Sequence, residues 1–270
     1  MMDVQPLAGK RIVVTRAPEQ ARTLIHALES LGAEVISLPA VAFAPPENWQ
    51  KVDEQLRRLG SFDAILFLSR NAVEYIFDRC AQLGIKCEML QSSNRLVAAV
   101  GPGTAGALAE KGLRVDYVAK NNTGEALAAE LRQSLAGRRV LLPRSDRGDD
   151  RVPAALRGAG ADVTDVIAYR TMAPALLDPA VLARIRRSEV DAIVFASPSA
   201  FQNLRDVIGA AELANLSARV QFAAIGPTTA RTIRDSGARV EIRAEEASAE
   251  ALAGAIAKHF QGRSATVRHS

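Results

Sequence analysis

Short apolar runs alternate along this chain with longer segments whose apolar residues recur every three to four positions. The first run, residues 10–15, is apolar and β-branched, and residues 18–32 follow it with helical spacing, beginning at Pro18 and ending at Gly32. Runs of the first kind predict buried strands, and segments of the second kind predict amphipathic helices. The alternation therefore predicts strand–helix–strand units, which form parallel sheets with right-handed crossovers.

The same alternation continues to the end of the chain. Further strands are expected over residues 34–39, 62–67, 95–100, 115–119, 138–142, 162–169, 190–195, 222–225 and 240–244. Helices are expected over residues 52–59, 72–77, 104–112, 124–131, 150–159, 179–187, 198–204 and 250–256. Two proline-containing breaks, residues 41–50 and 172–178, interrupt this pattern and predict extended linkers.

One stretch of the chain occurs twice. Residues 62–77 read FDAILFLSRNAVEYIF and residues 190–204 read VDAIVFASPSAFQNL, so that Ser69 and Ser197 lie 128 positions apart. Gly101-Pro102 recurs as Gly226-Pro227 with an offset of 125. Because the motifs keep their order and spacing, the sequence predicts two similar α/β units of about 125 residues each, within the usual size range of domains.

Composition narrows the functional classes. The chain has 270 residues, of which 48% are hydrophobic, enough to form the buried cores of two domains. Aromatic residues make up only 4%, so the base-stacking surfaces of nucleic-acid-binding proteins are not expected. The net charge of +4 comes with scattered arginines rather than a basic run, which suits an acidic small-molecule ligand.

Cellular location and metal content are predicted from what the sequence lacks. The first ten residues, MMDVQPLAGK, contain no apolar core of a signal sequence, and no apolar run reaches the roughly 18–20 residues needed to cross a bilayer. We therefore expect a cytoplasmic protein without a membrane partner. The spacing of Cys80 and Cys87 matches no zinc or redox motif, so no metal and no disulfide framework are expected.

Polar turns follow the ends of several predicted strands in both units. The carboxyl ends of parallel strands share one edge of the sheet, where helix N-termini offer N–H donors and partial positive charge to anions. For any single turn taken alone, helix capping is the favoured explanation. Recurrence of the turns favours a shared anionic ligand, bound by Thr15, Arg16, Ser69, Asn71, Gly101, Thr104, Arg144, Ser197, Ser199, Gly226, Thr228 and Thr229.

Several other chemistries find no support in the sequence. The Gly101 and Gly226 turns do not read GxGxxG after the first strand, and no GxxxxGK[ST] motif is present, so nucleotide binding is not expected. The three histidines lie outside the strand-end turns, which disfavours a Ser-His-Asp triad or a histidine metal site. The acidic residues 146, 149 and 150 alternate with arginines and indicate a solvated helix start.

Tyr169 ends the strand before the second linker. A phenol at this position could donate a proton or a hydrogen bond into a cleft, and it could equally be a packed side chain. The residue types alone favour the packed side chain.

Taken together, these motifs resemble those of uroporphyrinogen-III synthase. The resemblance covers residues 10–259 and rests on Thr15-Arg16, LGAEVISLP, the paired DAIxFxS turns, both Gly-Pro-x-Thr-Ala motifs and Tyr169-Arg170-Thr171. The family implies two flavodoxin-like parallel-sheet domains joined by a two-stranded linker. Residues 1–40 and 174–260 would form the first domain and residues 45–170 the second. Residues 261–270 are polar, and for that reason we expect them to form a disordered tail. A tandem division near Gly137 is the alternative.

The resemblance also implies a reaction. The enzyme dehydrates and cyclises hydroxymethylbilane to uroporphyrinogen III, inverting the last pyrrole ring through a spiro intermediate, without a cofactor or metal. Tyr169 matches the family's candidate for assisting loss of the hydroxyl, and Ser69, Thr104, Ser197 and Thr228 match polar positions that line its cleft. The implied partners are a tetrapyrrole with eight carboxylates and the preceding enzyme, which would hand it over to a monomeric synthase.

Two other functions use the same scaffold. A non-enzymatic two-domain protein could sense a tetrapyrrole or another polyanion without converting it. A flavodoxin-like enzyme acting on a phosphate ligand, such as a glycosyl transferase, is a further alternative, although acidic metal ligands and nucleotide motifs are missing from the strand ends. Fold alone does not separate these functions, because such scaffolds host many activities.

Overall fold

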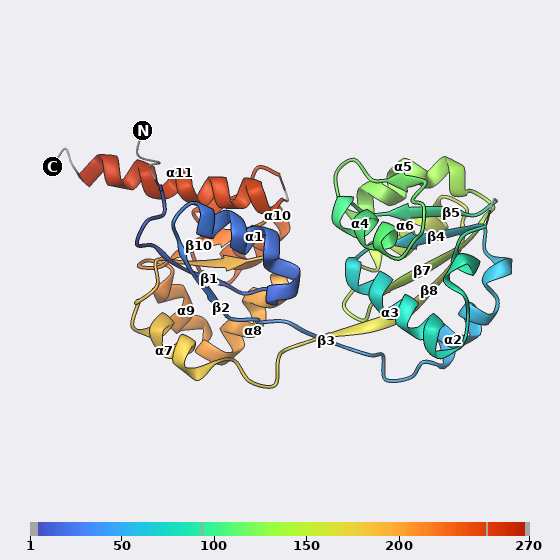
Figure 1. The fold of residues 1–270 in the computed structure, drawn as a ribbon, viewed down its shortest axis with the longest axis horizontal. Helices are drawn as coiled ribbons and strands as arrows, with labels where there is room; N and C mark the ends of the chain where they lie inside the picture. The colour runs from blue at the N-terminus through green and yellow to red at the C-terminus, as the bar shows by residue number, and fades with distance from the viewer. Residues whose placement is uncertain (1–4, 93, 247, 268–270) are drawn as a thin grey trace. The chain divides into compact units, whose positions relative to one another are not determined.

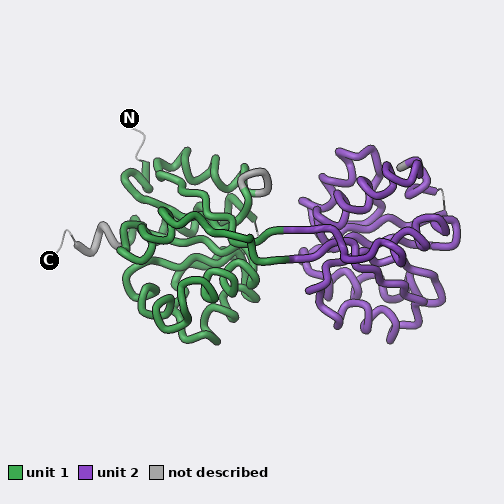
Figure 2. Tube along the Cα trace, turned by 90° about the horizontal axis from the view of Figure 1, so that it is seen from below, with its two compact units in different colours: residues 1–42, 172–270 green, residues 43–171 purple. Residues whose placement is uncertain are grey.

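The computed structural model describes residues 5–92, 94–246 and 248–267. The chain divides into two compact units: unit 1 comprises Met1–Ala42 with Met172–Ser270, and unit 2 comprises Phe43–Thr171 (Figure 2). The chain crosses between them twice, so a tandem division near Gly137 does not describe it.

Unit 1 is built on a five-stranded sheet in the order β11-β10-β9-β1-β2. All neighbouring strands in it pair in parallel. The strands are β1 (Arg11–Val14), β2 (Glu34–Ser37), β9 (Ala192–Phe195), β10 (Gln221–Ala224) and β11 (Ile242–Arg243). The four-residue strands β9 and β10 are buried along their whole length, as expected for a parallel sheet covered on both faces.

Helices cover both faces of the unit 1 sheet (Figure 1). Ile12 and Val14 pack with α1 (Pro18–Ser30) and α11 (Ala249–Val267) on one face. Val13 points to the opposite face, because successive side chains of a strand alternate. The second face is covered by α7 (Pro179–Arg186), α8 (Pro198–Ile208), α9 (Ala210–Leu216) and α10 (Pro227–Asp235).

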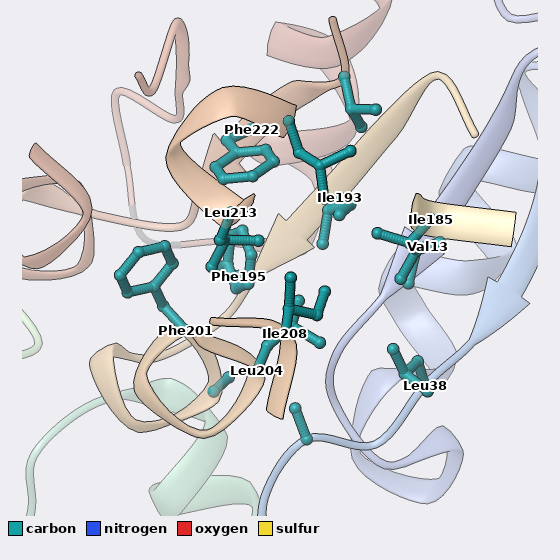
Figure 3. Close-up of a cluster of buried hydrophobic side chains, with 14 of the residues drawn as sticks. Val13, Leu38, Ile185, Ile193, Phe195, Phe201, Leu204, Ile208, Leu213 and Phe222 are labelled. Carbon is teal, nitrogen blue, oxygen red and sulfur yellow. The ribbon is translucent and has the colours of Figure 1, made fainter. Parts of the chain in front are cut away.

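Aromatic rings fill the centre of the second face. Phe195 of β9 lies edge-on to Phe201 of α8 and to Phe222 of β10, with ring centroids 5.3 Å apart in both pairs. Figure 3 shows these rings gathered with Leu204, Leu213 and other aliphatic side chains. The three rings are at most 1% exposed, so this cluster fixes α8 and its first turn relative to the sheet.

Unit 2 contains a six-stranded sheet in the order β3-β8-β7-β4-β5-β6. Its strands are β3 (Ala42–Ala44), β4 (Ala64–Phe67), β5 (Leu96–Ala99), β6 (Tyr117–Val118), β7 (Arg139–Ser145) and β8 (Asp162–Met172). From β8 to β6 all neighbours pair in parallel. The sequence predicted the segment around β3 only as an extended linker, whereas it adds a strand to this sheet.

The two faces of the unit 2 sheet are also covered. One face packs against α2 (Gln50–Arg57), α3 (Arg70–Gln82) and α4 (Pro102–Glu110), through residues such as Phe67 and Val97. The other packs against α5 (Gly124–Leu135) and α6 (Arg151–Gly158), through residues such as Leu66 and Val140. Two 3₁₀ turns, Leu59–Ser61 and Cys87–Leu90, complete the unit.

The sequence repeat is visible in matching hydrogen bonds. The Asp63 carboxylate accepts the backbone N–H of Arg139 at 2.9 Å, and the Asp191 carboxylate accepts that of Arg11 at the same distance. Each aspartate also donates its own N–H to the carbonyl of that arginine at 2.8 Å. The two aspartates therefore fix the entry of β4 beside β7 and of β9 beside β1. The strands of the two sequence copies are thus exchanged between the units.

The predicted α/β class with parallel sheets is confirmed. Helices α9 and α10 and the two 3₁₀ turns were not predicted. Helix α11 runs to Val267, so residues 261–267 of the expected disordered tail are helical, and residues 268–270 lie outside the described residues. None of the helices in the described residues is both long and apolar enough to cross a membrane.

Candidate functional site

In each unit the strand order reverses between two adjacent strands. The reversal lies between β1 and β9 in unit 1 and between β7 and β4 in unit 2. Open parallel sheets bind ligands beyond the carboxyl ends of the strands at such a switch point. The predicted residues Thr15 and Ser197 lie at the ends of the two strands that flank this point in unit 1. Ser69 and Arg144 lie at the ends of the two strands that flank it in unit 2.

Ser69 and Ser197 cap the helices that leave these points. Ser69 Oγ accepts the N–H of Ala72 at 3.0 Å, and Ser197 Oγ accepts that of Ala200 at 3.2 Å. Both serines have extended backbone angles, with φ of −163° and −159°. Capping is therefore a structural role that both serines share, and it does not by itself indicate a ligand site.

Ser69 makes one contact that the capping role does not require. Its Oγ lies 2.9 Å from the Oη of Tyr169 in β8. The Tyr169 ring stacks on Tyr75 with centroids 5.6 Å apart, and Phe43 meets it edge-on at 5.7 Å. Tyr169 is only 6% exposed. Tyr169 is therefore a packed side chain that also forms a hydrogen bond through its hydroxyl.

Electrostatics keep the Tyr169 phenol protonated. Burial is the main effect that raises its pKa above the usual value near 10, and the charge of Asp146 acts in the same direction. Hydrogen bonds with Ser69, Asn71 and Ser145 act the opposite way without cancelling the rise. At neutral pH the group is therefore an O–H donor.

A second set of polar groups lies next to Tyr169. Ser145 Oγ is 2.8 Å from Thr171 Oγ1 and 3.0 Å from Asp146 Oδ1. An ionised carboxylate only accepts hydrogen bonds, so the single hydroxyl hydrogen of Ser145 goes to Asp146 and Thr171 donates to Ser145. We call Ser69, Asn71, Ser145, Asp146, Tyr169 and Thr171 the unit 2 polar cluster.

Unit 1 has no equivalent of this cluster at the repeated positions. Subtracting 128 places Ala17 opposite Ser145, Pro18 opposite Asp146 and Val41 opposite Tyr169. Ser197, the counterpart of Ser69, keeps its hydroxyl and its capping bond, and Ser199, the counterpart of Asn71, is also polar. The two copies therefore share the fold and the caps, and the additional hydroxyl and carboxylate groups belong to unit 2.

The two glycine turns open α4 and α10. Thr104 and Thr229 occupy the third position of these helices and are 5% and 3% exposed, whereas Thr228 is exposed. Thr229 is therefore the structural counterpart of Thr104, and Thr228 corresponds to Gly103. A Cβ built on Gly101 would lie 2.8 Å from the Asn122 side chain, so a glycine fits best there.

Two of the predicted site residues are engaged within their own unit. The Thr15 hydroxyl is fully buried and donates to the Val194 carbonyl at 2.7 Å. The Arg144 guanidinium contacts Asp150 at 2.6 Å and Asp165 at 3.0 Å, and its side chain is 11% exposed. Both residues hold strand ends in place rather than presenting a free group to a ligand.

Other predicted residues are accessible. Arg16 is exposed, and Ser199 is half-buried one residue after the α8 N-terminus. The sequence interpretation did not include Arg147, which is exposed and follows the polar cluster at the end of β7. The described residues contain no group of three His, Cys, Asp or Glu side chains that could hold a metal ion.

Comparison with known proteins identifies relatives along nearly the whole chain. Residues 22–254 match the family model described as uroporphyrinogen-III synthase HemD. The chain is 32% identical over 259 residues to the uroporphyrinogen-III synthase of Synechococcus elongatus, covering 94% of this chain and 97% of that protein. It is also 32% identical over 231 residues to a putative uroporphyrinogen-III synthase of Methanothermobacter thermautotrophicus, covering 84% and 89%.

Solved structures show the same fold. A mutant uroporphyrinogen III synthase from Thermus thermophilus superimposes with a TM-score of 0.64 at 21% identity, covering 94% of this chain and all of that one. The uroporphyrinogen-III synthetase of Helicobacter pylori gives a TM-score of 0.60 at 17% identity, covering 93% and 99%.

Proposed function

Because the chain belongs to the uroporphyrinogen-III synthase family, we propose that it converts hydroxymethylbilane to uroporphyrinogen III. In this reaction the substrate loses its hydroxyl as water, the last pyrrole ring is inverted, and the macrocycle closes. The enzyme is a lyase that needs no cofactor. Binding energy that holds the flexible chain in a ring-closing shape supplies much of the rate enhancement.

The observation that carries this proposal is the contact between Tyr169 and Ser69 in the unit 2 polar cluster. Loss of the substrate hydroxyl requires a proton, and a phenol that stays neutral at pH 7 is a suitable donor. Tyr169 is the catalytic residue of the proposal. The proton goes to the departing oxygen, the carbon–oxygen bond breaks, and water leaves. Closure of the macrocycle releases a proton from the terminal pyrrole, which restores the phenol.

Ser69 connects the buried phenol to the surface. Its Oγ uses one lone pair for the Ala72 N–H. If Tyr169 donates to the second lone pair, the Ser69 hydrogen is directed away from Tyr169 and is available to the substrate. Since Ser69 is half-buried, it provides the exposed end of this hydroxyl pair.

The strand-end turns are proposed to bind the substrate's carboxylates. Helix N-termini offer backbone N–H groups there, and Arg16 and Arg147 offer exposed positive charge. Thr15 and Arg144 support these turns through their contacts within the units. The proposed contact residues are Arg16, Ser69, Asn71, Gly101, Thr104, Arg147, Ser197, Ser199, Gly226, Thr228 and Thr229.

The catalytic role is tested by Tyr169→Phe with Tyr75→Phe as its matched control. Both variants remove one phenol oxygen from the same pair of stacked rings. We expect Tyr169→Phe to lower kcat for uroporphyrinogen III by about 10²-fold or more, as for loss of a general acid, and Tyr75→Phe to change it less than about twofold. Full activity of Tyr169→Phe would leave Tyr169 with a packing role only.

The enzyme is further proposed to act as a cytoplasmic monomer that receives hydroxymethylbilane from the preceding enzyme. The chemical reason is that hydroxymethylbilane closes by itself to the unrearranged type I isomer, so a short transfer limits this loss. Sedimentation equilibrium tests the monomer, for which the chain mass is 28.8 kDa.

A further inference from the structure

We propose that Asp146 is a positioning residue of this site, whose carboxylate holds the β-bulge that turns Tyr169 toward Ser69. The consequence for catalysis rests on the proposed function, whereas the placement of Tyr169 by Asp146 does not.

The bulge lies in β8, directly before Tyr169. β7 and β8 pair one to one from Arg139 and Asp162 up to Arg144 and Ile167, but the next residue of β7, Ser145, pairs with Tyr169. Ala168 therefore has no partner on β7. A bulge of this kind adds one residue to a strand and re-aims the side chains that follow it.

The core clusters show the effect of the bulge on Tyr169. Val163 packs on the face covered by α5 and α6, and Val166 and Ala168 pack on the face covered by α2, α3 and α4. Strict alternation would place Tyr169 on the face of Val163, because it follows Ala168 directly. Tyr169 instead packs with Val166 and Ala168. The extra residue therefore brings the phenol to the side of the sheet where Ser69 begins α3.

Asp146 bonds to the strand on both sides of Arg170. Its backbone N–H donates to the Tyr169 carbonyl at 3.1 Å, and its Oδ1 accepts the Thr171 N–H at 2.8 Å. β7 ends at Ser145, so the Asp146 side chain continues the hydrogen-bonding pattern where the backbone of β7 turns away. This clamp fixes the segment 169–171 immediately after the bulge.

The same carboxylate also orients buried hydroxyl groups. Ser145 and Thr171 are each 9% exposed, whereas Asp146 is exposed. Asp146 Oδ1 accepts from Ser145 Oγ and from the Arg147 N–H, both at 3.0 Å. With its two oxygens an ionised carboxylate can accept several such bonds, and it cannot donate any. Asp146 therefore directs the Ser145 hydrogen to its own carboxylate, which leaves the Ser145 oxygen to accept the Thr171 hydrogen.

The fold itself does not require this arrangement. In unit 1, β1 and β2 pair one to one from Arg11 and Glu34 to Val14 and Ser37, and this pairing ends before the position that corresponds to the bulge. Beyond it, the N–H groups of Leu38 and Ala40 donate to the carbonyls of Val14 and Thr15. The repeat places Pro18, which lacks an N–H, opposite Asp146. The same sheet order is thus formed without a carboxylate at this position, which favours orientation of Tyr169 as the role of Asp146.

Two substitutions at Asp146 separate position from charge. Asp146→Asn keeps an acceptor oxygen at the same place and removes the charge, whereas Asp146→Glu keeps the charge and moves it by one methylene. Asp149→Ala is the control, because Asp149 is in the same loop and pairs with Arg151. We expect kcat to fall by about 10²-fold in Asp146→Glu, since small misplacement of a catalytic group has effects of this size, and by less than about threefold in Asp146→Asn.

Placement of Tyr169 is measured without turnover. The chain has three tyrosines, so labelling with 3-fluorotyrosine gives three ¹⁹F resonances, which single Tyr→Phe variants assign. We expect the Tyr169 resonance to move in Asp146→Glu, while Asp146→Asn keeps it near the wild-type position and Tyr117 is constant in every variant.

Each result decides the proposal. If Asp146→Glu has the kcat of the wild type and an unchanged Tyr169 resonance, the proposal is wrong. It is also wrong if Asp146→Glu is active while Asp146→Asn is inactive. If the wild-type protein forms no uroporphyrinogen III, the proposed function fails, and the ¹⁹F spectra still decide whether Asp146 positions Tyr169.

Discussion

Ser69 and Ser197 occupy equivalent positions in the two sequence copies, which allows the Tyr169 contact to be isolated from the helix cap. Both serines accept one N–H of the following helix, and Ser69 alone also bonds to Tyr169. We predict that Ser69 and Tyr169 are energetically coupled. The coupling is the difference between two changes in the free energy of unfolding: the change that Ser69→Ala causes in the wild type and the change that it causes in Tyr169→Phe.

The contacts of Ser69 set the size of each contribution to the free energy of unfolding. Loss of an N-cap serine costs about 1 kcal/mol, and this cost applies with or without the phenol. A buried hydroxyl left without its partner costs about 1–3 kcal/mol. Because Asn71 and Ser145 lie close enough to the phenol to replace Ser69 as hydrogen-bond partners, we expect the lower end of that range. Ser69→Ala should therefore lower the free energy of unfolding of unit 2 by about 2 kcal/mol, with a coupling of about 1 kcal/mol to Tyr169.

The assay uses the single tryptophan of the chain. Trp49 packs against the core of unit 2, and its ring lies 4.8 Å from the Arg79 guanidinium, so its fluorescence reports unfolding of unit 2. Guanidinium titrations of the wild type, both single variants and the double variant give the coupling. Ser197→Ala is the control, and it should leave the Trp49 transition unchanged. A coupling below about 0.3 kcal/mol, within the usual additivity error, would refute the contact between the two hydroxyls.

Two further predictions concern a half-buried ion pair and a buried arginine of unit 2. Hydrogen bonds from Arg79 hold the pKa of Asp53 below its usual value, so this pair stabilises the fold above the unfolded pKa near 4 and the stabilisation is lost as pH falls through the lower folded pKa. Asp53→Asn should therefore weaken the acid sensitivity of the Trp49 transition between about pH 5 and pH 2; an unchanged pH dependence would exclude the pair as its source. Arg95 is 7% exposed and donates to three backbone carbonyls, so Arg95→Met should cost about 3–5 kcal/mol in guanidinium titrations. The exposed Arg58→Met should cost less than about 0.5 kcal/mol, and equal costs for both variants would contradict the anchoring role of Arg95.

The repeat made much of the fold predictable. A constant offset of 128 identified Asp63 and Asp191 as equivalent positions, and both form the same pair of backbone bonds at a strand entry. Hydrophobic periodicity located the long helices and buried strands because each buries one regular face. Short elements such as α9 were missed, since seven residues contain too few turns for the periodicity to show.

The exchange of strands between the copies could not be predicted from periodicity. β1 and β7 have the same apolar pattern, so β4 and β9 offer them equivalent edges. Pairing of β1 with β9 was expected only from the resemblance to a family. Which of these strands pair depends on the linkers and on many contacts between residues far apart in the sequence. A local pattern of apolar residues does not show such contacts.

The site was only partly predictable for a similar reason. Arg144 was a reasonable anion-binding candidate by position, but its partner Asp165 is twenty-one residues away and pairs with it only across two strands. The register shift beside Ala168 also has no local signal. One signal was available: an offset of 125 links Thr104 to Thr229 rather than to Thr228.

The proposed reaction is tested most directly by the isomer of its product. Purified protein would be given freshly generated hydroxymethylbilane, and the oxidised uroporphyrins separated by isomer, with a protein-free reaction alongside. Closure without enzyme yields type I, so a predominance of type III is the result we expect. Type I alone, at the rate of the protein-free reaction, would contradict the synthase activity; binding of the tetrapyrrole under those conditions would instead favour a sensor.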